Sequence, residues 1–132
     1  MKTLVDTSVW SLALRKKGPT NDRTVGILAA LLNGNEDIVL IGIILQEILQ
    51  AFRSDSTVKR VAQYLAPVPL LPLDRSDFVN AATLHRKCAS KGIAASTVDC
   101  LIATAAINHQ CVLLTADKDF ARIAQHCKLK LA

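Results

Sequence analysis

Two acidic side chains each follow a short apolar run in the 132-residue chain. Asp6 comes directly after "TLV", and Asp117 comes one residue after "CVLLT". Apolar runs of this length are typical of buried parallel strands, and ligands bind beyond the carboxyl ends of such strands. We therefore expect both carboxylates at the same rim of a sheet. The alternative for Asp6 is helix capping, although Thr7 and Ser8 could cap the next helix without it.

A third acid, Glu47, lies inside the apolar segment "IILQEILQAF". On a helical wheel its nearest neighbours are Ile43, Ile44 and Ala51, which place it toward the apolar side of a helix. A carboxylate there needs a partner, because removing an isolated anion from water costs several kcal/mol. The partner is either a cation shared with other acids or a Lys or Arg of another element.

The fourth acid, Asp99, occupies the first turn of a helix that is apolar nearly all round. Its spacing from Ser96 fits a capping box. The same position, flanked by Ile102, Ala103 and Ala106, also points inward. Capping and metal binding are compatible here, so both interpretations stay open.

Acids that converge in one cavity repel each other, which raises their proton affinity unless a cation keeps them ionised. Hard carboxylate oxygens without a His or Cys cluster select Mg²⁺ or Mn²⁺. The three histidines and four cysteines of the chain show no spacing of a tetrahedral zinc site. We therefore expect a Mg²⁺ or Mn²⁺ site, and we expect free thiols within regular elements.

The elements that must position these acids alternate along the chain. We expect buried strands at residues 3–5, 38–41 and 111–115, with edge segments around the prolines at 67–72 and at 129–131. We expect helices at residues 8–15, 22–32, 43–52, 56–65, 75–91, 96–109 and 118–126, with left-handed residues at Asn33-Gly34 and Gly92 and a break at Gly18-Pro19. This order predicts a single α/β domain over residues 1–132, with a mostly parallel sheet between two layers of helices.

Composition limits the classes of partner. The net charge is +5, from 16 Lys and Arg against 11 Asp and Glu, and the basic residues include a cluster at Arg15, Lys16 and Lys17. A polyanion is therefore a plausible partner. The sequence contains no apolar stretch of about 20 residues and no leader-like start, so we expect a cytoplasmic protein.

Four motifs occur in a characteristic order: "LVDTSVW", Glu47 within "GIILQEIL", Asp99 within "STVDCLIATAA", and "LLTADKDF". With these motifs the chain resembles the PIN-domain nucleases, particularly the VapC-like toxins of toxin–antitoxin pairs, over essentially its whole length. The resemblance implies an endoribonuclease dependent on Mg²⁺ or Mn²⁺. It also implies a homodimer and inhibition by a VapB-like antitoxin with an acidic tail that also binds DNA.

The resemblance implies that Asp6 and Asp99 are metal ligands and that Glu47 and Asp117 complete the acidic pocket as further ligands, all four being catalytic residues. "TADKDF" also offers Asp119, as an alternative ligand or one that acts through water. Three hydroxyl residues at the same rim are candidates to position the scissile phosphate, with ordinary capping and turn bonding as the alternative: Thr7, Ser8 and Thr115. Glu47 or Asp117 would orient or deprotonate the attacking water.

Two other classes of protein remain. A catalytically inactive RNA-binding or adaptor domain would keep the fold and use only its basic surface. A phosphoryl-accepting receiver-like domain also gathers acids at strand ends around Mg²⁺. Receivers usually carry paired acids after the first strand, where this chain has Thr7 and Ser8 after Asp6.

Overall fold

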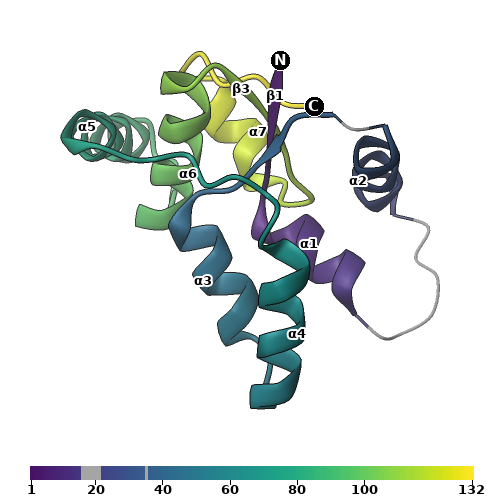
Figure 1. Cartoon of the computed structure of the whole chain (residues 1–132). Helices are drawn as coiled ribbons and strands as arrows, with labels where there is room; N and C mark the ends of the chain where they lie inside the picture. The colour runs from purple at the N-terminus through teal and green to yellow at the C-terminus, as the bar shows by residue number, and fades with distance from the viewer. Residues whose placement is uncertain (16–21, 35) are drawn as a thin grey trace.

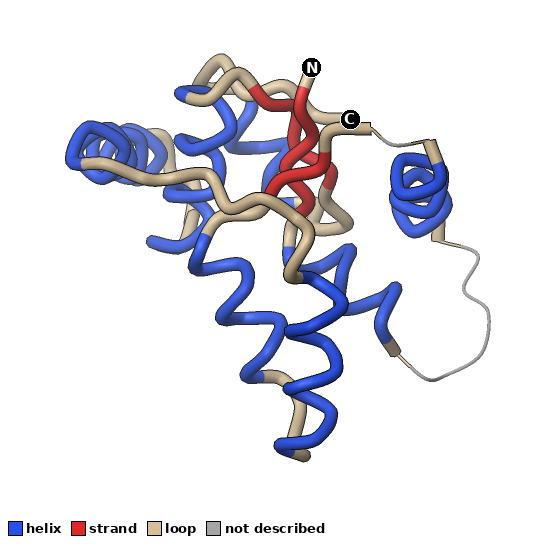
Figure 2. Tube along the Cα trace, viewed as in Figure 1, coloured by secondary structure: helices blue, strands red, loops and turns tan. Residues whose placement is uncertain are grey.

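The structure is a computed structural model, and it describes residues 1–15, 22–34 and 36–132. Within those ranges it contains three strands and seven helices (Figures 1 and 2). The strands are β1 (Lys2–Val5), β2 (Ile38–Val39) and β3 (Cys111–Leu114). The helices are α1 (Thr7–Leu14), α2 (Arg23–Asn33), α3 (Gly42–Gln50), α4 (Asp55–Leu65), α5 (Arg75–Ser90), α6 (Thr97–Asn108) and α7 (Asp119–Ala124). None of these described helices is long and apolar enough to cross a bilayer.

The three strands form a parallel sheet in the order β2-β1-β3, with β1 at the centre. Thr3 pairs with Ile38 on one side of β1, and Val5 pairs with Leu114 on the other. In Figure 1, β1 starts near the N-terminal label and ends beside α1. Because all three strands run the same way, their carboxyl ends lie at one edge of the sheet. The expected parallel arrangement is confirmed.

The strands are mostly apolar because helices cover both faces of the sheet, and only Lys2 and Thr3 at the start of β1 are polar. Leu4, Val5 and Leu113 have no exposed surface. A sheet with one wet face would alternate apolar and polar residues, whereas a covered parallel sheet carries continuous apolar runs. The helix α6 shows the same burial, with Ile102, Ala103 and four of its neighbours in the core. The three-layer α/β/α architecture expected from the sequence is therefore present.

Short extended segments widen the sheet on both sides, one beside β2 and one beside β3. Leu40 receives a backbone hydrogen bond from Leu71 N–H (2.8 Å) and donates one to the carbonyl of Pro69 (2.9 Å). The prolines of this segment are tolerated because an edge strand leaves one side of its backbone unpaired. At the opposite edge, Leu131 forms a parallel bridge with Leu113. Both predicted edge segments are confirmed.

Several expected helix ends differ in detail. Gly92 has a φ of +74°, as expected for a left-handed residue after a helix. The same expectation at Gly34 is wrong: its φ is −90°, and its N–H bonds to the carbonyl of Ala30 in a right-handed turn. The first helix begins at Thr7, one residue earlier than expected. The expected break at Gly18-Pro19, with Lys16 and Lys17, lies outside the described residues.

The second strand and the last helix are shorter than the sequence suggests. β2 ends at Val39, because Leu40 pairs with the proline segment, and α7 ends at Ala124. Cys127 consequently lies beyond α7, so the expectation that all four cysteines sit in regular elements is wrong for this one. All four thiols are free, as expected, and Cys127 alone of them is only partly buried.

Candidate active site

Three of the singled-out acids form a compact group. Asp99, Asp117 and Asp119 each offer one carboxylate oxygen within 4.8 Å of the other two. Asp99 lies in the first turn of α6, Asp117 follows β3, and Asp119 begins α7. They meet because α6 packs against both β3 and α7, at the edge where β3 ends. The described part of the chain thus brings together acids that are up to 20 residues apart in sequence.

Asp6 lies at the same edge, held by the sheet itself. Its backbone N–H donates to the carbonyl of Leu114 (2.9 Å), which extends the pairing of β1 with β3 by one residue. Its side chain is nearly buried, and Oδ2 accepts hydrogen bonds from the hydroxyls of Ser8 (2.7 Å) and Thr115 (2.9 Å). Asp6 occupies the N-cap position of α1, but its side chain forms no cap bond. Capping therefore does not explain this carboxylate.

The electrostatics of Asp99 join the four aspartates into one site. Burial raises the pKa of the Asp99 carboxyl, and the negative charges of Asp117, Asp6 and Asp119 raise it further, against a hydrogen bond with Ser96. The Ser96 hydroxyl also accepts the N–H of Asp99 (3.0 Å), which is the capping half of the predicted box. Capping and clustering therefore coexist at Asp99. A cation at this site would offset the repulsion.

Glu47 stands next to this group rather than within it. It lies on α3 and is half-buried, and its Oε1 accepts a 2.8 Å hydrogen bond from the hydroxyl of Thr7. The alternative of a salt bridge finds no support in the described ranges, where the ion pair found joins His109 to Asp77. Neither Glu47 nor Asp6 belongs to the 4.8 Å group. Glu47 is tied to the site through Thr7, the neighbour of Asp6.

The three hydroxyl residues at the rim all hold carboxylates in place. Ser8 and Thr115 both donate to Asp6, and Thr7 donates to Glu47. The oxygens of Ser8 and Thr115 in turn accept backbone N–H groups of Ala116 and Asp117, each at 3.0 Å. Because each hydroxyl hydrogen is already donated to a carboxylate, this geometry favours a role in orienting the acids over a role in binding phosphate. A role in binding the scissile phosphate stays a prediction.

Asp117 and Asp119 both reach the group, so the choice between them as a direct ligand stays open. The N–H of Asp119 donates to Oδ1 of Asp117 (2.9 Å), which fixes the turn that carries both side chains. All the atoms that this group offers to a metal ion are carboxylate oxygens. Oxygen donors of this kind fit a hard divalent cation rather than zinc. The residues present therefore suit a divalent metal.

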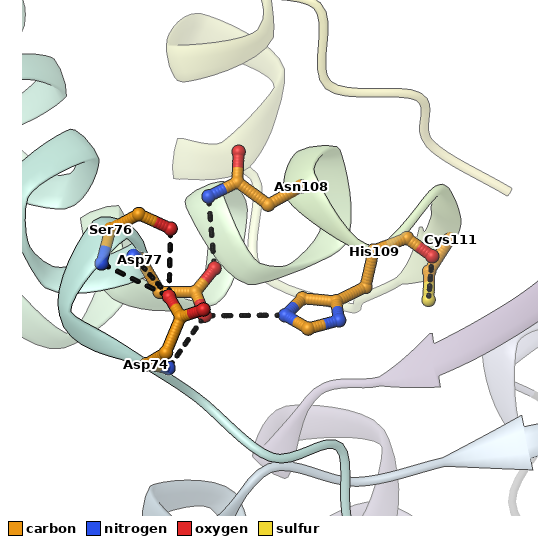
Figure 3. Close-up of polar contacts among 6 residues, drawn as sticks. All are labelled: Asp74, Ser76, Asp77, Asn108, His109 and Cys111. Atoms are coloured by element: carbon orange, nitrogen blue, oxygen red, sulfur yellow. Dashed lines mark hydrogen bonds and ion pairs between the residues drawn. The ribbon is translucent and has the colours of Figure 1, made fainter.

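A second polar cluster lies away from these acids and was missed by the sequence analysis (Figure 3). Asp77 is 2% exposed and accepts hydrogen bonds from Asn108 Nδ2 (2.9 Å) and from the N–H of Asp74 (3.0 Å). Its Oδ2 also contacts His109 Nε2 at 3.3 Å. Asp74 and Asp77 form a capping box at the start of α5. The spacing D-x-x-D before an amphipathic run was the available signal. The cluster joins α5 to the end of α6.

A covered parallel sheet with carboxylates gathered beyond its strand ends defines an α/β domain whose acidic group has the oxygen ligands that suit a divalent cation. The family model described as "PIN domain" matches residues 3–125, and the chain belongs to this family. The match excludes a receiver-like domain.

Curated relatives span nearly the whole chain. "Ribonuclease VapC11" of Mycobacterium tuberculosis and "VapC ribonuclease Mb1587" of Mycobacterium bovis are each 30% identical to it over 131 residues, which are 98% of this chain and 96% of the relative.

Solved structures share the fold at lower identity. VapBC2 from Rickettsia felis, bound to a promoter DNA fragment, gives a TM-score of 0.79 at 20% identity and covers 100% of this chain and 98% of its own. FitAcB from Neisseria gonorrhoeae gives 0.75 at 21% identity, with coverages of 98% and 95%.

Proposed function

We propose that the protein is an endoribonuclease that hydrolyses RNA phosphodiester bonds with Mg²⁺ or Mn²⁺ and is the toxin of a toxin–antitoxin pair. One observation carries this proposal: carboxylates of Asp99, Asp117 and Asp119 within 4.8 Å of one another, in a PIN-domain chain. Relatives that are 30% identical over almost the whole chain are named ribonucleases, which supports RNA as the substrate.

The residues that would hold the cation are Asp99, Asp117 and Asp6, with Asp119 as a direct or water-mediated ligand. When bound, a divalent cation lowers the pKa of water and stabilises negative charge on the phosphate oxygens. The carboxylate of Asp6 is held in one orientation, because its Oδ2 accepts hydrogen bonds from two hydroxyls. Of the two metals, Mg²⁺ has the stronger preference for oxygen ligands in octahedral geometry.

Glu47 or Asp117 would orient the attacking water and accept its proton. The Thr7 hydroxyl holds one oxygen of Glu47 and leaves the other without a hydrogen bond from the described residues. Where Glu47 is the base, this second oxygen is the one that would accept the proton of the attacking water. Outside the five pocket acids, 16 basic residues stand against 6 acidic ones, and this excess suits the phosphate backbone of the substrate.

The test is cleavage of RNA by Asp6→Asn in the presence of Mn²⁺. We expect cleavage to fall by at least about 10³-fold, while circular dichroism shows an unchanged fold. Asp55→Asn is the matched control, because Asp55 is an exposed carboxylate of α4 away from the acid group. Full activity of Asp6→Asn would refute the site. The rival, a catalytically inactive RNA-binding domain, predicts RNA binding without any cleavage in Mn²⁺ and the same affinity in EDTA.

The antitoxin would bind a groove of about 470 Å³ between the end of α1 and α4. Its apolar lining includes Leu14, Phe52 and Val61, and its basic residues are Arg15, Arg53 and Arg60, with no Asp or Glu among the lining residues. Apolar side chains between arginines suit a chain segment that carries acidic residues and apolar anchors. A VapB-like antitoxin with an acidic tail has this chemistry.

The homodimer implied by the resemblance also remains part of the proposal, and sedimentation velocity measures it directly.

A further inference from the structure

Two hollows near the end of α6 join into one furrow. The first, of about 270 Å³, is lined by residues of α5 and α6 and by the segment after α7, and the second, of about 490 Å³, continues toward the start of β3. They share Ile107 and Lys128 in their linings, so they are contiguous. We call this surface the lysine furrow and define it by Lys87, His126, Lys128 and Lys130 together with Asn108 and Gln110.

The part of the lysine furrow around Cys111, Lys128 and Lys130 lies at the end of the sheet opposite the acids. Cys111, which lines it, is the first residue of β3, whereas Asp117 comes after the last residue of that strand. β3 is four residues long, so the two sites are separated by at least the length of the strand, about 13 Å. An RNA that contacts both must therefore be several nucleotides long.

The backbone fixes the two lysines at the end of the furrow. Lys130 O accepts the N–H of Leu113 (2.8 Å), and Ala132 N–H donates to Leu113 O (2.9 Å), so this segment is part of the sheet edge. Leu129 is buried, whereas Lys128 and Lys130 on either side of it are exposed. In an extended segment, alternate side chains point to the same side. Both ammonium groups are therefore presented to solvent from one rigid stretch of chain.

Among the described residues that line the furrow there are three lysines and His126 but no Asp or Glu to balance their charge. Asp77 lies behind Asn108, but it is buried and already accepts hydrogen bonds from Asn108 and His109. Lys2 is excluded from the furrow, because it lines a different hollow that also contains Glu36 and Asp37. One lysine could be explained by the negative end of α6, but two lysines in each of the two hollows exceed that need.

We propose that the lysine furrow is a second contact surface for the phosphodiester backbone of the RNA, remote from the bond that is cut. This inference rests on the proposed ribonuclease function for the identity of the polyanion. The clustered acids repel the RNA backbone, so cationic groups elsewhere on the protein must supply affinity. Backbone contacts of this kind depend on salt and hardly on sequence.

The test uses the double variant Lys128→Gln/Lys130→Gln. Its control, Lys59→Gln/Arg75→Gln, removes two positive charges from exposed positions of α4 and α5 outside the furrow. Binding of a fluorescein-labelled single-stranded RNA of about 30 nucleotides is measured in EDTA, where cleavage does not interfere, across a salt series. We expect the furrow variant to bind several-fold more weakly and its log–log salt slope to fall by about 1.4, since each phosphate contact contributes about 0.7. The affinity and the salt slope of the control variant should fall by less than half as much.

Cleavage with Mn²⁺ separates this surface from the acid site. The furrow variant should cut the long RNA more slowly but a dinucleotide at the wild-type rate, because a substrate with one phosphodiester cannot reach both sites. Equal affinity and slope for the furrow and control variants would overturn the proposal, as would a change of oligomeric state in the furrow variant alone. If the wild type cleaves no RNA, the proposed function fails, whereas the binding comparison in EDTA still reports on the furrow.

Discussion

The hydroxyl of Thr7 donates a 2.8 Å hydrogen bond to Oε1 of Glu47, across 40 positions of sequence. Thr7 directly follows Asp6 at the end of the central strand, so the bond ties the middle of α3 to the edge where the acids gather. Glu47 is thereby oriented although it is not in the compact group of carboxylates. A neutral hydroxyl holds the carboxylate of Glu47 in place without placing a positive charge beside it.

Thr7→Val removes this hydrogen bond with little change in volume. We expect Mn²⁺-dependent RNA cleavage to fall by about 10- to 100-fold, the range usual for residues that support the ligands of a metal site. Thr7→Ser is the matched control, because it keeps the hydroxyl, and it should retain most of the activity. Cleavage by Thr7→Val at the rate of Thr7→Ser would show that Glu47 needs no such support.

Asp99→Asn relieves the repulsion among the aspartates when no cation is bound. Burial and three neighbouring acids raise the pKa of Asp99, so its ionised form destabilises the folded state in EDTA. We expect the melting temperature of Asp99→Asn in EDTA to exceed that of the wild type by about 1–3 °C. Saturating Mn²⁺ should reverse the order, because it stabilises only the protein with the full set of ligands. Calorimetry with and without Mn²⁺ measures both effects.

The sign of the pH dependence follows from the same shift. A raised pKa in the folded state means that Asp99 binds a proton more readily when folded than when unfolded. In EDTA its destabilising effect is therefore absent below the ordinary pKa of an aspartate and develops as pH rises through the raised value. The melting difference between Asp99→Asn and the wild type should vanish at low pH. A difference that grows as pH falls would contradict the clustering of these acids.

The positions of Asp6 and Asp117 could be predicted because they depend on short-range patterns. Each follows a brief apolar run, and parallel strands bring their carboxyl ends to one edge whatever the order of the chain. The ends of helices were less predictable. Gly34 and Gly92 both follow a helix, yet only Gly92 is left-handed, since the carbonyl of Ala30 captures the N–H of Gly34 in a right-handed turn. Nothing local in the sequence distinguishes the two.

The hydrogen-bond partners of Asp77 and Glu47, which lie far away in the sequence, could not be predicted. Asp77 meets Asn108 and His109 across 31 and 32 positions, and no periodic pattern encodes such a meeting. Glu47 was expected on the apolar side of its helix, and this burial is only partial. That it takes its hydrogen bond from Thr7 rather than from a cationic side chain is a result of how α3 packs on α1. Packing decides these partners.

Asp77→Ala should cost stability without affecting chemistry. It removes half of the capping box of α5 and the hydrogen bonds that the buried carboxylate accepts from Asn108 and His109, which together should cost about 2–3 kcal/mol. Denaturation in urea measures the loss. Asp55→Ala removes an exposed acid from the first turn of α4 and should cost less than about 1 kcal/mol. Equal losses in the two variants would mean that the Asp77 cluster contributes nothing special.

The Asp77 cluster also predicts a pH dependence opposite to that of Asp99. Burial acts to raise the pKa of Asp77, but the hydrogen bonds from the Asp74 N–H, Asn108 and His109 outweigh it, so the pKa lies below its usual value. The stabilisation is therefore complete above the ordinary pKa of an aspartate and is lost as pH falls through the lowered one. The stability gap between the wild type and Asp77→Asn should shrink as pH falls below the ordinary pKa of an aspartate and through the lowered pKa of Asp77. A constant gap would contradict this assignment.

Arg60→Glu reverses one charge in the groove between α1 and α4, where the antitoxin is proposed to bind. If an acidic segment occupies the groove, the new carboxylate faces like charge, and affinity should fall at least about tenfold. The proposed VapB-like antitoxin, titrated by calorimetry, is the probe. Lys59→Glu is the control, because it makes the same charge change at the preceding position of α4 but does not line the groove.

RNA cleavage by Arg60→Glu in the absence of the antitoxin should stay within about twofold of the wild type, since the groove contains none of the clustered acids. Equal affinities for the two variants would place the partner on another surface, and a loss of cleavage in Arg60→Glu alone would show that this arginine serves the RNA instead.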